Sequence, residues 1–172
     1  MGQKILIPVT GSERSKEALD YALKQFPDAD VTALHVLTSG SGDIGSMGSG
    51  DPSPFHKAVS SGDDDSESGD LSAIGPGGED IFGGDDSLGS EEEVAEQFLA
   101  AVQAYTKKRG ADIETDLMRG NPHRAIVKRA EDGDYDMVVM GNHGRDGVAR
   151  VLLGSVAEKV VRRSPVPVLV VR

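Results

Sequence analysis

Short apolar runs alternate along the chain with segments in which apolar residues recur every three or four positions. Three runs, Lys4–Val9, Val31–Leu37 and Val166–Val171, are rich in Val, Leu and Ile and are bounded by turn residues, which is typical of strands buried on both faces. Asp136–Met140 has the same character, and Ile113–Arg119 alternates enough to form a strand. The pattern therefore predicts five strands, and Pro167 places part of the last one at an edge or a bulge.

Two longer helices are predicted from their ends and their apolar faces. Ser12 is placed to cap the first helix, which Pro27 stops. Ser90–Glu93 has the pattern of a capping box, and Gly110 closes the second helix. The expected apolar faces are Ala18, Leu19, Ala22, Leu23 and Phe26 in the first helix, and Val94, Phe98, Ala101, Val102 and Tyr105 in the second.

Two shorter helices complete the alternation. Asn121 and Pro122 supply an N-cap and a first-turn proline for a helix that runs to about Asp132. Gly154 and Ser155 open a last helix, which runs through Arg163. The order predicts an α/β fold, a doubly wound five-stranded parallel sheet with helices on both faces, which is a Rossmann-like arrangement. Ligands of such sheets bind at the carboxyl ends of the strands, so the loops after Val9, Leu37 and Met140 are the ones to inspect.

Charge is concentrated in the middle of the chain. The formal net charge is −11, and residues 38–90 contribute eleven acids against one base, Lys57, together with 13 of the 22 glycines. We interpret this stretch as a flexible acidic Gly/Ser/Asp insertion in a single domain that spans 1–172. It could be a solvated spacer or, because it follows the second strand, a lid over a bound ligand. A calcium loop that began at Asp63 would have Ser68 and Ile74 at the positions where such loops need glycine and glutamate. Adaptation to a high-salt host is another interpretation of the acidity.

Composition excludes several classes of protein. The absence of cysteine excludes disulfides and thiolate metal sites, and the absence of tryptophan and the few aromatics argue against a stacking surface for nucleic acid. No apolar run approaches the roughly 20 residues that span a bilayer, and the first residues lack a signal pattern. We therefore expect a cytoplasmic protein with no nucleic-acid or membrane partner.

A glycine-rich loop follows the fourth strand. Gly141-Asn142-His143-Gly144 is separated by nine residues from Gly154-Ser155 at a helix start. Glycines let backbone amides approach an anion, and the helix start adds unpaired amides and a positive dipole end. The loop lacks the lysine of a P-loop, and the first turn lacks the dinucleotide fingerprint.

The spacing G-x2-G-x9-G-S, preceded by VVM and followed by PVPVLVV, resembles that of the universal stress protein family. The N-terminal ILIPVTGSERSKEAL and the LHV of the second strand resemble it as well, so that the match covers about residues 3–38 and 91–172. The resemblance implies the adenine nucleotide alpha hydrolase-like fold and an ATP-binding member, with Mg²⁺ as a possible companion of ATP.

Carried over by position, the resemblance implies a set of site residues. Adenine would lie against Val9, Val36 and Met140, ribose would meet Gly141 and the backbone near Pro8 and Thr10, and the phosphates would meet His143, Gly144, Gly154, Ser155 and Val156. Two positions depart from the family pattern: Thr10 stands where aspartate is usual, and Asn142 stands where serine is commoner.

Other candidate residues have simpler interpretations. His35 is expected to be a hydrogen-bonded sheet histidine, and His56 and His123 lack metal-ligand spacing. Arg145 and Arg150 either reach the phosphates or face water. Ser12 is a helix cap rather than a nucleophile, and the sequence presents no catalytic residue and no metal ligand.

Two functions remain open at this point. The first is an ATP-binding regulatory protein of the stress response that acts as a homodimer through residues 166–171 and hydrolyses ATP slowly or not at all. The alternative is a nucleotide-free interaction module of the same fold, which binds partner proteins through its dimer surface or its acidic insertion.

Overall fold

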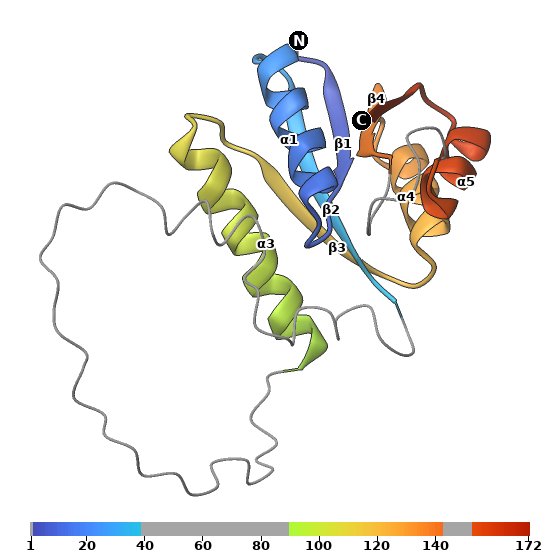
Figure 1. Cartoon of the computed structure of the whole chain (residues 1–172), viewed down its shortest axis with the longest axis horizontal. Helices are drawn as coiled ribbons and strands as arrows, with labels where there is room; N and C mark the ends of the chain where they lie inside the picture. The colour runs from blue at the N-terminus through green and yellow to red at the C-terminus, as the bar shows by residue number, and fades with distance from the viewer. Residues whose placement is uncertain (1, 39–89, 143–152) are drawn as a thin grey trace, which may run out of the picture.

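Five parallel strands form one sheet in the computed structural model, which describes residues 2–38, 90–142 and 153–172 (Figure 1). The strand order is β3-β2-β1-β4-β5. The strands are β1 (Lys4–Pro8), β2 (Asp30–Leu37), β3 (Glu114–Arg119), β4 (Met137–Gly141) and β5 (Val168–Val171). This confirms the predicted α/β fold with a five-stranded parallel sheet. The insertion lies outside the described residues, as do His143, Gly144, Arg145 and Arg150.

The last strand is shorter than predicted, because a turn precedes it. The Ser164 hydroxyl donates to the carbonyl of Val166 at 2.7 Å and accepts from the Val166 amide at 3.3 Å. Val166 is thus held in a turn, and the ladder with β4 pairs Val138 with Val168 and continues from there. Pro167 precedes the strand, and its carbonyl still accepts from the Val138 amide at 2.9 Å.

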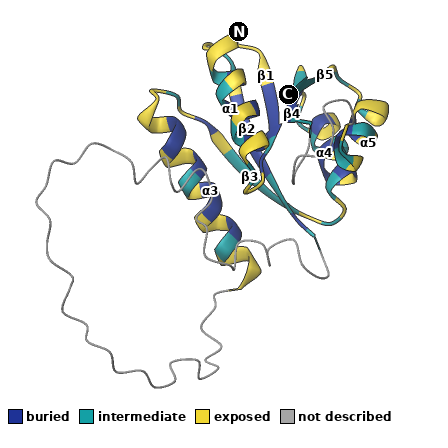
Figure 2. Cartoon of the chain, viewed as in Figure 1, coloured by how far each residue is buried: buried dark blue, intermediate teal, exposed yellow. Residues whose placement is uncertain are grey.

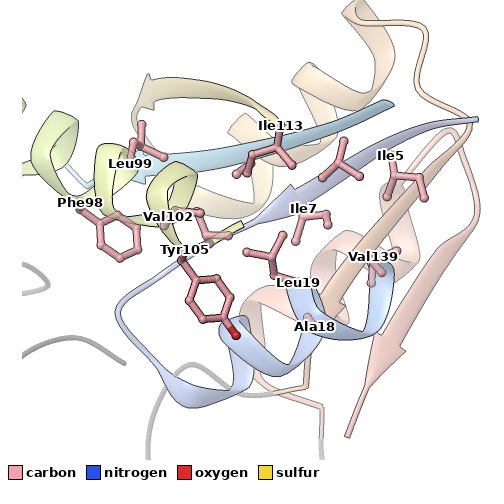
Figure 3. Packing of buried hydrophobic residues seen from close by; sticks show 14 residues of the cluster. Ile5, Ile7, Ala18, Leu19, Phe98, Leu99, Val102, Tyr105, Ile113 and Val139 are labelled. Atoms are coloured by element: carbon pink, nitrogen blue, oxygen red, sulfur yellow. The ribbon is translucent and has the colours of Figure 1, made fainter. Parts of the chain in front are cut away.

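Helices cover both faces of the sheet, α1 (Glu13–Gln25) and α3 (Glu91–Lys108) on one face and α4 (Pro122–Asp132) and α5 (Ser155–Arg163) on the other (Figure 1). Successive residues of β1 point to opposite faces of the sheet and pack alternately into the two cores. Ile5 and Ile7 pack with α1 and α3, as Figure 3 shows, whereas Leu6 packs with α4 and α5. Each face of the sheet therefore has its own hydrophobic core.

The helix ends follow the sequence signals. Ser12 caps α1, the Ser90–Glu93 capping box is complete, and Gly110 beyond α3 has a φ of +76°, a conformation that favours glycine. Asn121 occupies the N-cap position of α4, but its side chain makes no capping hydrogen bond within the described part of the chain.

The buried face of α3 is rotated relative to the prediction. Phe98, Val102 and Tyr105 are buried as expected, whereas Val94 and Ala101 are only half-buried. The buried positions include Ala95, Leu99 and Thr106 instead. The helix lies against β2 and β3, so its buried face follows its packing on these strands rather than the most apolar stripe (Figure 2).

Candidate functional site

The order of strands reverses between β1 and β4. The chain runs from β1 outward to β2 and β3, then crosses back to place β4 on the other side of β1. In doubly wound sheets the loops that leave such neighbours part in opposite directions and open a crevice at the carboxyl ends of the strands. The residues that follow β1 and β4 therefore line the candidate site.

The end of β1 is fixed by its neighbour β2. The amide of Val9 donates to the carbonyl of Leu34 at 2.8 Å, and the Val9 side chain is buried. The carbonyl of Val9 lies 2.9 Å from Nδ1 of His35, whose ring centroid is 5.0 Å from that of Phe98. His35 is a hydrogen-bonded sheet histidine, as predicted, and it fixes the backbone where the crevice begins.

A network of hydroxyls holds the turn between β1 and α1. The Thr10 amide donates to Oγ of Ser15 at 2.9 Å, and that hydroxyl donates to the Thr10 carbonyl at 2.8 Å. The hydroxyls of Thr10 and Ser12 lie 2.9 Å apart, and Ser12 also accepts from the Ser15 amide. Ser15 was not predicted as part of the site; its only sequence signal is a small polar residue on the apolar face of a helix, three positions after the cap.

Gly141 allows α1 to approach the end of β4. A Cβ atom at this position would lie 2.7 Å from the carbonyl oxygen of Arg14 and 2.9 Å from its carbonyl carbon. Both atoms belong to the backbone of the first turn of α1 and cannot move aside cheaply. Glycine is therefore required here by the close packing of β4 against α1.

Asn142 joins three elements at the mouth of the crevice. Its amide donates to the carbonyl of Val171 at the end of β5, at 3.0 Å, and its carbonyl accepts from the amide of Gly154, at 2.7 Å. Its side-chain oxygen Oδ1 is buried and has no hydrogen-bond partner in the described ranges. The residue was noted in the sequence only as a departure from the family pattern, because a backbone contact leaves no sequence signal.

The start of α5 faces the same region. Gly154 is the N-cap of α5 and supplies no side-chain cap, so the amides of the first turn have no side-chain acceptor from it. Ser155, the first helical residue, is exposed, and Val156 is half-buried against the core of the α4 and α5 face. A helix start of this kind attracts anions through its amides and its dipole.

The three residues expected around adenine do not share one face of the sheet. Val36 and Met140 pack on the core that α4 and α5 cover, whereas the Val9 side chain is buried in the core that α1 and α3 cover. Pro8 is half-buried and Thr10 is exposed at the end of β1. The structure thus brings Pro8, Val9, Thr10 and Gly141 to neighbouring strand ends and ties Gly154 to them through Asn142.

The described ranges contain no cluster of three or more His, Cys, Asp or Glu residues that could hold a metal ion. Within the same ranges, the helices are all too short or too polar to cross a membrane.

These features define a doubly wound α/β protein whose strand order reverses between β1 and β4, which is where sheets of this kind bind their ligands. The model of the universal stress protein family matches residues 1–172, and the chain is 33% identical to universal stress protein MJ0531 of Methanocaldococcus jannaschii, over 99% of this chain and 82% of the relative. The chain belongs to the universal stress protein family, whose members are stress-response proteins, and the resemblance read from the glycine spacing is confirmed.

Solved structures agree with this assignment. A structure of protein MJ0577 has a TM-score of 0.60 at 27% identity and covers 99% of this chain and 96% of its own. Universal stress protein UspA of Lactobacillus plantarum has a TM-score of 0.63 at 20% identity, with 99% of this chain and 97% of that chain covered. A universal stress protein in complex with cAMP has a TM-score of 0.54 at 21% identity, over 99% of this chain and 96% of that one. At such low identity the last two show the fold alone.

Proposed function

We propose that this protein binds ATP in the crevice between the ends of β1 and β4 and regulates a stress response in its nucleotide-bound form. Ribose and adenine would lie over Pro8–Thr10, Gly141 and the face that carries Val36 and Met140. The phosphates would lie at Gly154, Ser155 and Val156, with His143 and Gly144 from the loop between. A cytoplasmic location remains a prediction from the sequence.

The observation that carries this proposal is the hydrogen bond from the Gly154 amide to the Asn142 carbonyl, 2.7 Å long. This bond holds the start of α5 against the end of β4, so the anion-attracting helix start lies at the strand-order reversal. The buried Oδ1 of Asn142 supplies an acceptor for a ligand hydroxyl or amino group. The universal stress protein that was crystallised with cAMP shares this fold, so the fold itself accommodates an adenine nucleotide.

We expect hydrolysis to be slow or absent, below about 1 per second. Within the described residues, the hydroxyls of Thr10, Ser12 and Ser15 bond to one another and to the backbone rather than to a carboxylate or an imidazole that could act as a general base. Thr10 holds its turn through these bonds and is therefore a poor candidate for proton transfer.

The test compares ATP binding by the wild type and a Ser155→Glu variant. A carboxylate at the first residue of α5 suits the helix dipole, so the free protein should stay folded with an unchanged or higher Tm, whereas the same charge repels the phosphates. We expect ATP with Mg²⁺ to raise the Tm of the wild type and at least a tenfold weaker ATP affinity in the variant, measured by thermal shift and calorimetry. ADP, AMP and GTP then define the specificity.

Gln97→Glu is the matched control, because it adds the same charge at an exposed position of α3. It should bind ATP as the wild type does. No thermal shift of the wild type at millimolar ATP would contradict the proposal, and so would equal affinities of the wild type and Ser155→Glu.

One observation favours a second candidate, the nucleotide-free interaction module. Thr10 replaces the aspartate that is usual in the family, and its hydroxyl is taken up by Ser12. Mass spectrometry of small molecules extracted from the purified protein separates the two candidates, because a nucleotide that copurifies excludes the second one.

A further inference from the structure

A groove of about 320 Å³ runs between α4 and α5, on the outer side of these helices. It is lined by His123, Arg124, Val127, Lys128, Glu131 and Arg163. Volumes of this size are at the lower end of those that hold small ligands. None of these residues belongs to the crevice between β1 and β4.

Cations without partners surround the groove. Arg124, Arg163 and the neighbouring Lys159 form no ion pair within the described ranges, in a chain whose formal net charge is −11. Their neighbours are paired: Lys128 lies 2.7 Å from Asp132, and Arg162 lies 2.7 Å from Glu158. These cations therefore give the groove a positive local charge, and Glu131 is the one carboxylate among its lining residues.

His123 lies where these cations converge. Its side chain is only 8% exposed and lines the groove, and it makes no hydrogen bond within the part of the chain that the structure describes. Burial, followed by the charges of Lys159, Arg163 and Arg124, lowers the pKa of its imidazole below the ordinary value. The ring nitrogens of His123 are not among the buried unpartnered polar atoms of the described residues, so they are accessible from the groove to a bound ligand.

The local backbone adds to the positive charge. His123 and Arg124 stand in the first turn of α4, where the helix dipole already favours anions, and no acidic residue is present in that turn. Asn121 does not cap the helix with its side chain. The first turn of α4 thus lacks the negative charge that helix starts usually carry.

We propose that the α4–α5 groove binds the compact dianionic oxyanion of a phosphate monoester, at a site separate from the nucleotide crevice. Three cations gather around one imidazole, which suits a small dianion better than an extended polymer, and guanidinium groups bind phosphate with paired hydrogen bonds. The acidic chain also disfavours nucleic acid, whose backbone carries about one charge per 1.7 Å of duplex.

Binding is linked to the protonation of His123. The cations that face His123 are Arg124 and Lys128 on α4 and Lys159 and Arg163 on α5, and Glu131 is the carboxylate among the lining residues. An anion in the groove offsets the positive charge of these cations. The bound anion therefore raises the pKa of His123, and binding takes up protons. The affinity for the anion increases as the pH falls toward the pKa of His123 in the free protein. It is lower above the pKa of His123 in the complex.

The experiment follows the imidazole signals of the full chain by NMR, with inorganic sulfate as the probe at constant ionic strength. Sulfate keeps its charge between pH 5 and 8, so a change of affinity with pH reports on the protein. The His123 signals are assigned with His123→Gln. We expect saturable sulfate shifts at His123 and a higher His123 pKa in the complex.

Two variants test the cations. Arg124→Gln with Lys159→Gln should weaken sulfate binding at least tenfold, and Arg162→Gln, whose cation is paired with Glu158, should bind as the wild type does. Circular dichroism verifies the fold of each variant. A His123 response that chloride reproduces, that does not saturate, or that survives the double substitution overturns the proposal.

Further measurements separate this site from the nucleotide crevice and identify the ligand source. Ser155→Glu should keep the sulfate response of His123, whatever it does to ATP binding, and loss of the response in this variant overturns the claim of a separate site. A small sugar phosphate and a phosphoserine peptide then compete with sulfate. Tighter binding of either identifies the source, and weaker binding of both overturns the phosphate-ester assignment.

Discussion

At position 141 the first turn of α1 leaves room for a hydrogen atom only, because a Cβ would meet the backbone of Arg14 at 2.7 Å. The next residue, Asn142, contributes its backbone to β5 and to the start of α5. Ser15 closes the turn after β1 through two hydrogen bonds to Thr10. Three single residues therefore position the strand ends at the candidate site. Gly141 and Asn142 do so through backbone contacts, and Ser15 through its side chain.

Gly141→Ala should destabilise the protein by about 1–3 kcal/mol, the usual cost of an added methyl group in a packed site. The methyl group would push the first turn of α1 away from β4, so ATP affinity should fall as well. Urea unfolding measures the first effect and calorimetry with ATP the second. A free energy of unfolding within about 0.5 kcal/mol of the wild type would contradict the packing argument.

At the scale of elements, a polar cluster fastens α3 to α1. The hydroxyl of the buried Tyr105 donates to Oδ1 of Asp20 at 2.5 Å, and Nζ of Lys16 lies 3.1 Å from Oδ2 of the same carboxylate. The guanidinium of Arg109 lies 3.8 Å from the centre of the Tyr105 ring. The cluster joins residues 85 positions apart and fixes the helix that follows the insertion.

Tyr105→Phe should lower the free energy of unfolding by about 1 kcal/mol, because the ring still packs while the hydrogen bond to Asp20 is lost. Tyr21→Phe is the matched control, since Tyr21 is 39% exposed on the same helix as Asp20. Chemical denaturation of both variants measures the difference, and equal stabilities would show that the Tyr105 hydroxyl contributes nothing.

The hydrogen bond between Tyr105 and Asp20 predicts that the free energy of unfolding depends on pH in the alkaline range. Burial, and then the hydrogen bond to Asp20, raises the pKa of Tyr105 above its ordinary 10.0. The folded state therefore holds the proton more tightly than the unfolded state, and this stabilisation is complete below pH 10 and is lost as the pH rises through the folded pKa. The free energy of unfolding of Tyr105→Phe should therefore decline less steeply with pH than that of the wild type above pH 10.

At the scale of the whole molecule, the sheet ends on β5. This strand pairs with β4 on one side, and on its other side no strand pairs with it among the described residues. Its four residues, Val168–Val171, are apolar and only half-buried. An apolar edge strand that is left unpaired favours association with a second copy, so we infer a two-fold dimer through β5.

Val170→Lys should convert such a dimer to a monomer, because it places a charge in the apolar edge. Val161→Lys is the control, since it makes the same exchange at a position of α5 that is 43% exposed. Sedimentation and light scattering measure the mass, and circular dichroism verifies the fold. A wild-type monomer would refute the dimer, and a Val170→Lys dimer would place the interface elsewhere.

Much of the fold was predictable from local sequence. The five strands, the four described helices and the capping of α1 and α3 follow from short patterns, and the described boundaries differ from the predictions by one or two residues. The predicted buried face of α3 was partly wrong, because its contacts with β2 and β3 decide which residues are buried. The glycine spacing indicated the family, but not how the crevice is held together.

The sequence by itself determined the periodicity of the elements, their ends and the positions of the glycines, since these depend on residues close together along the chain. Only the tertiary structure placed Val9 on the opposite face from Val36 and Met140, joined Asn142 to β5 and α5, and gathered cations from two helices around His123. Such contacts depend on strand order and helix packing, which bring distant residues together without leaving a local pattern.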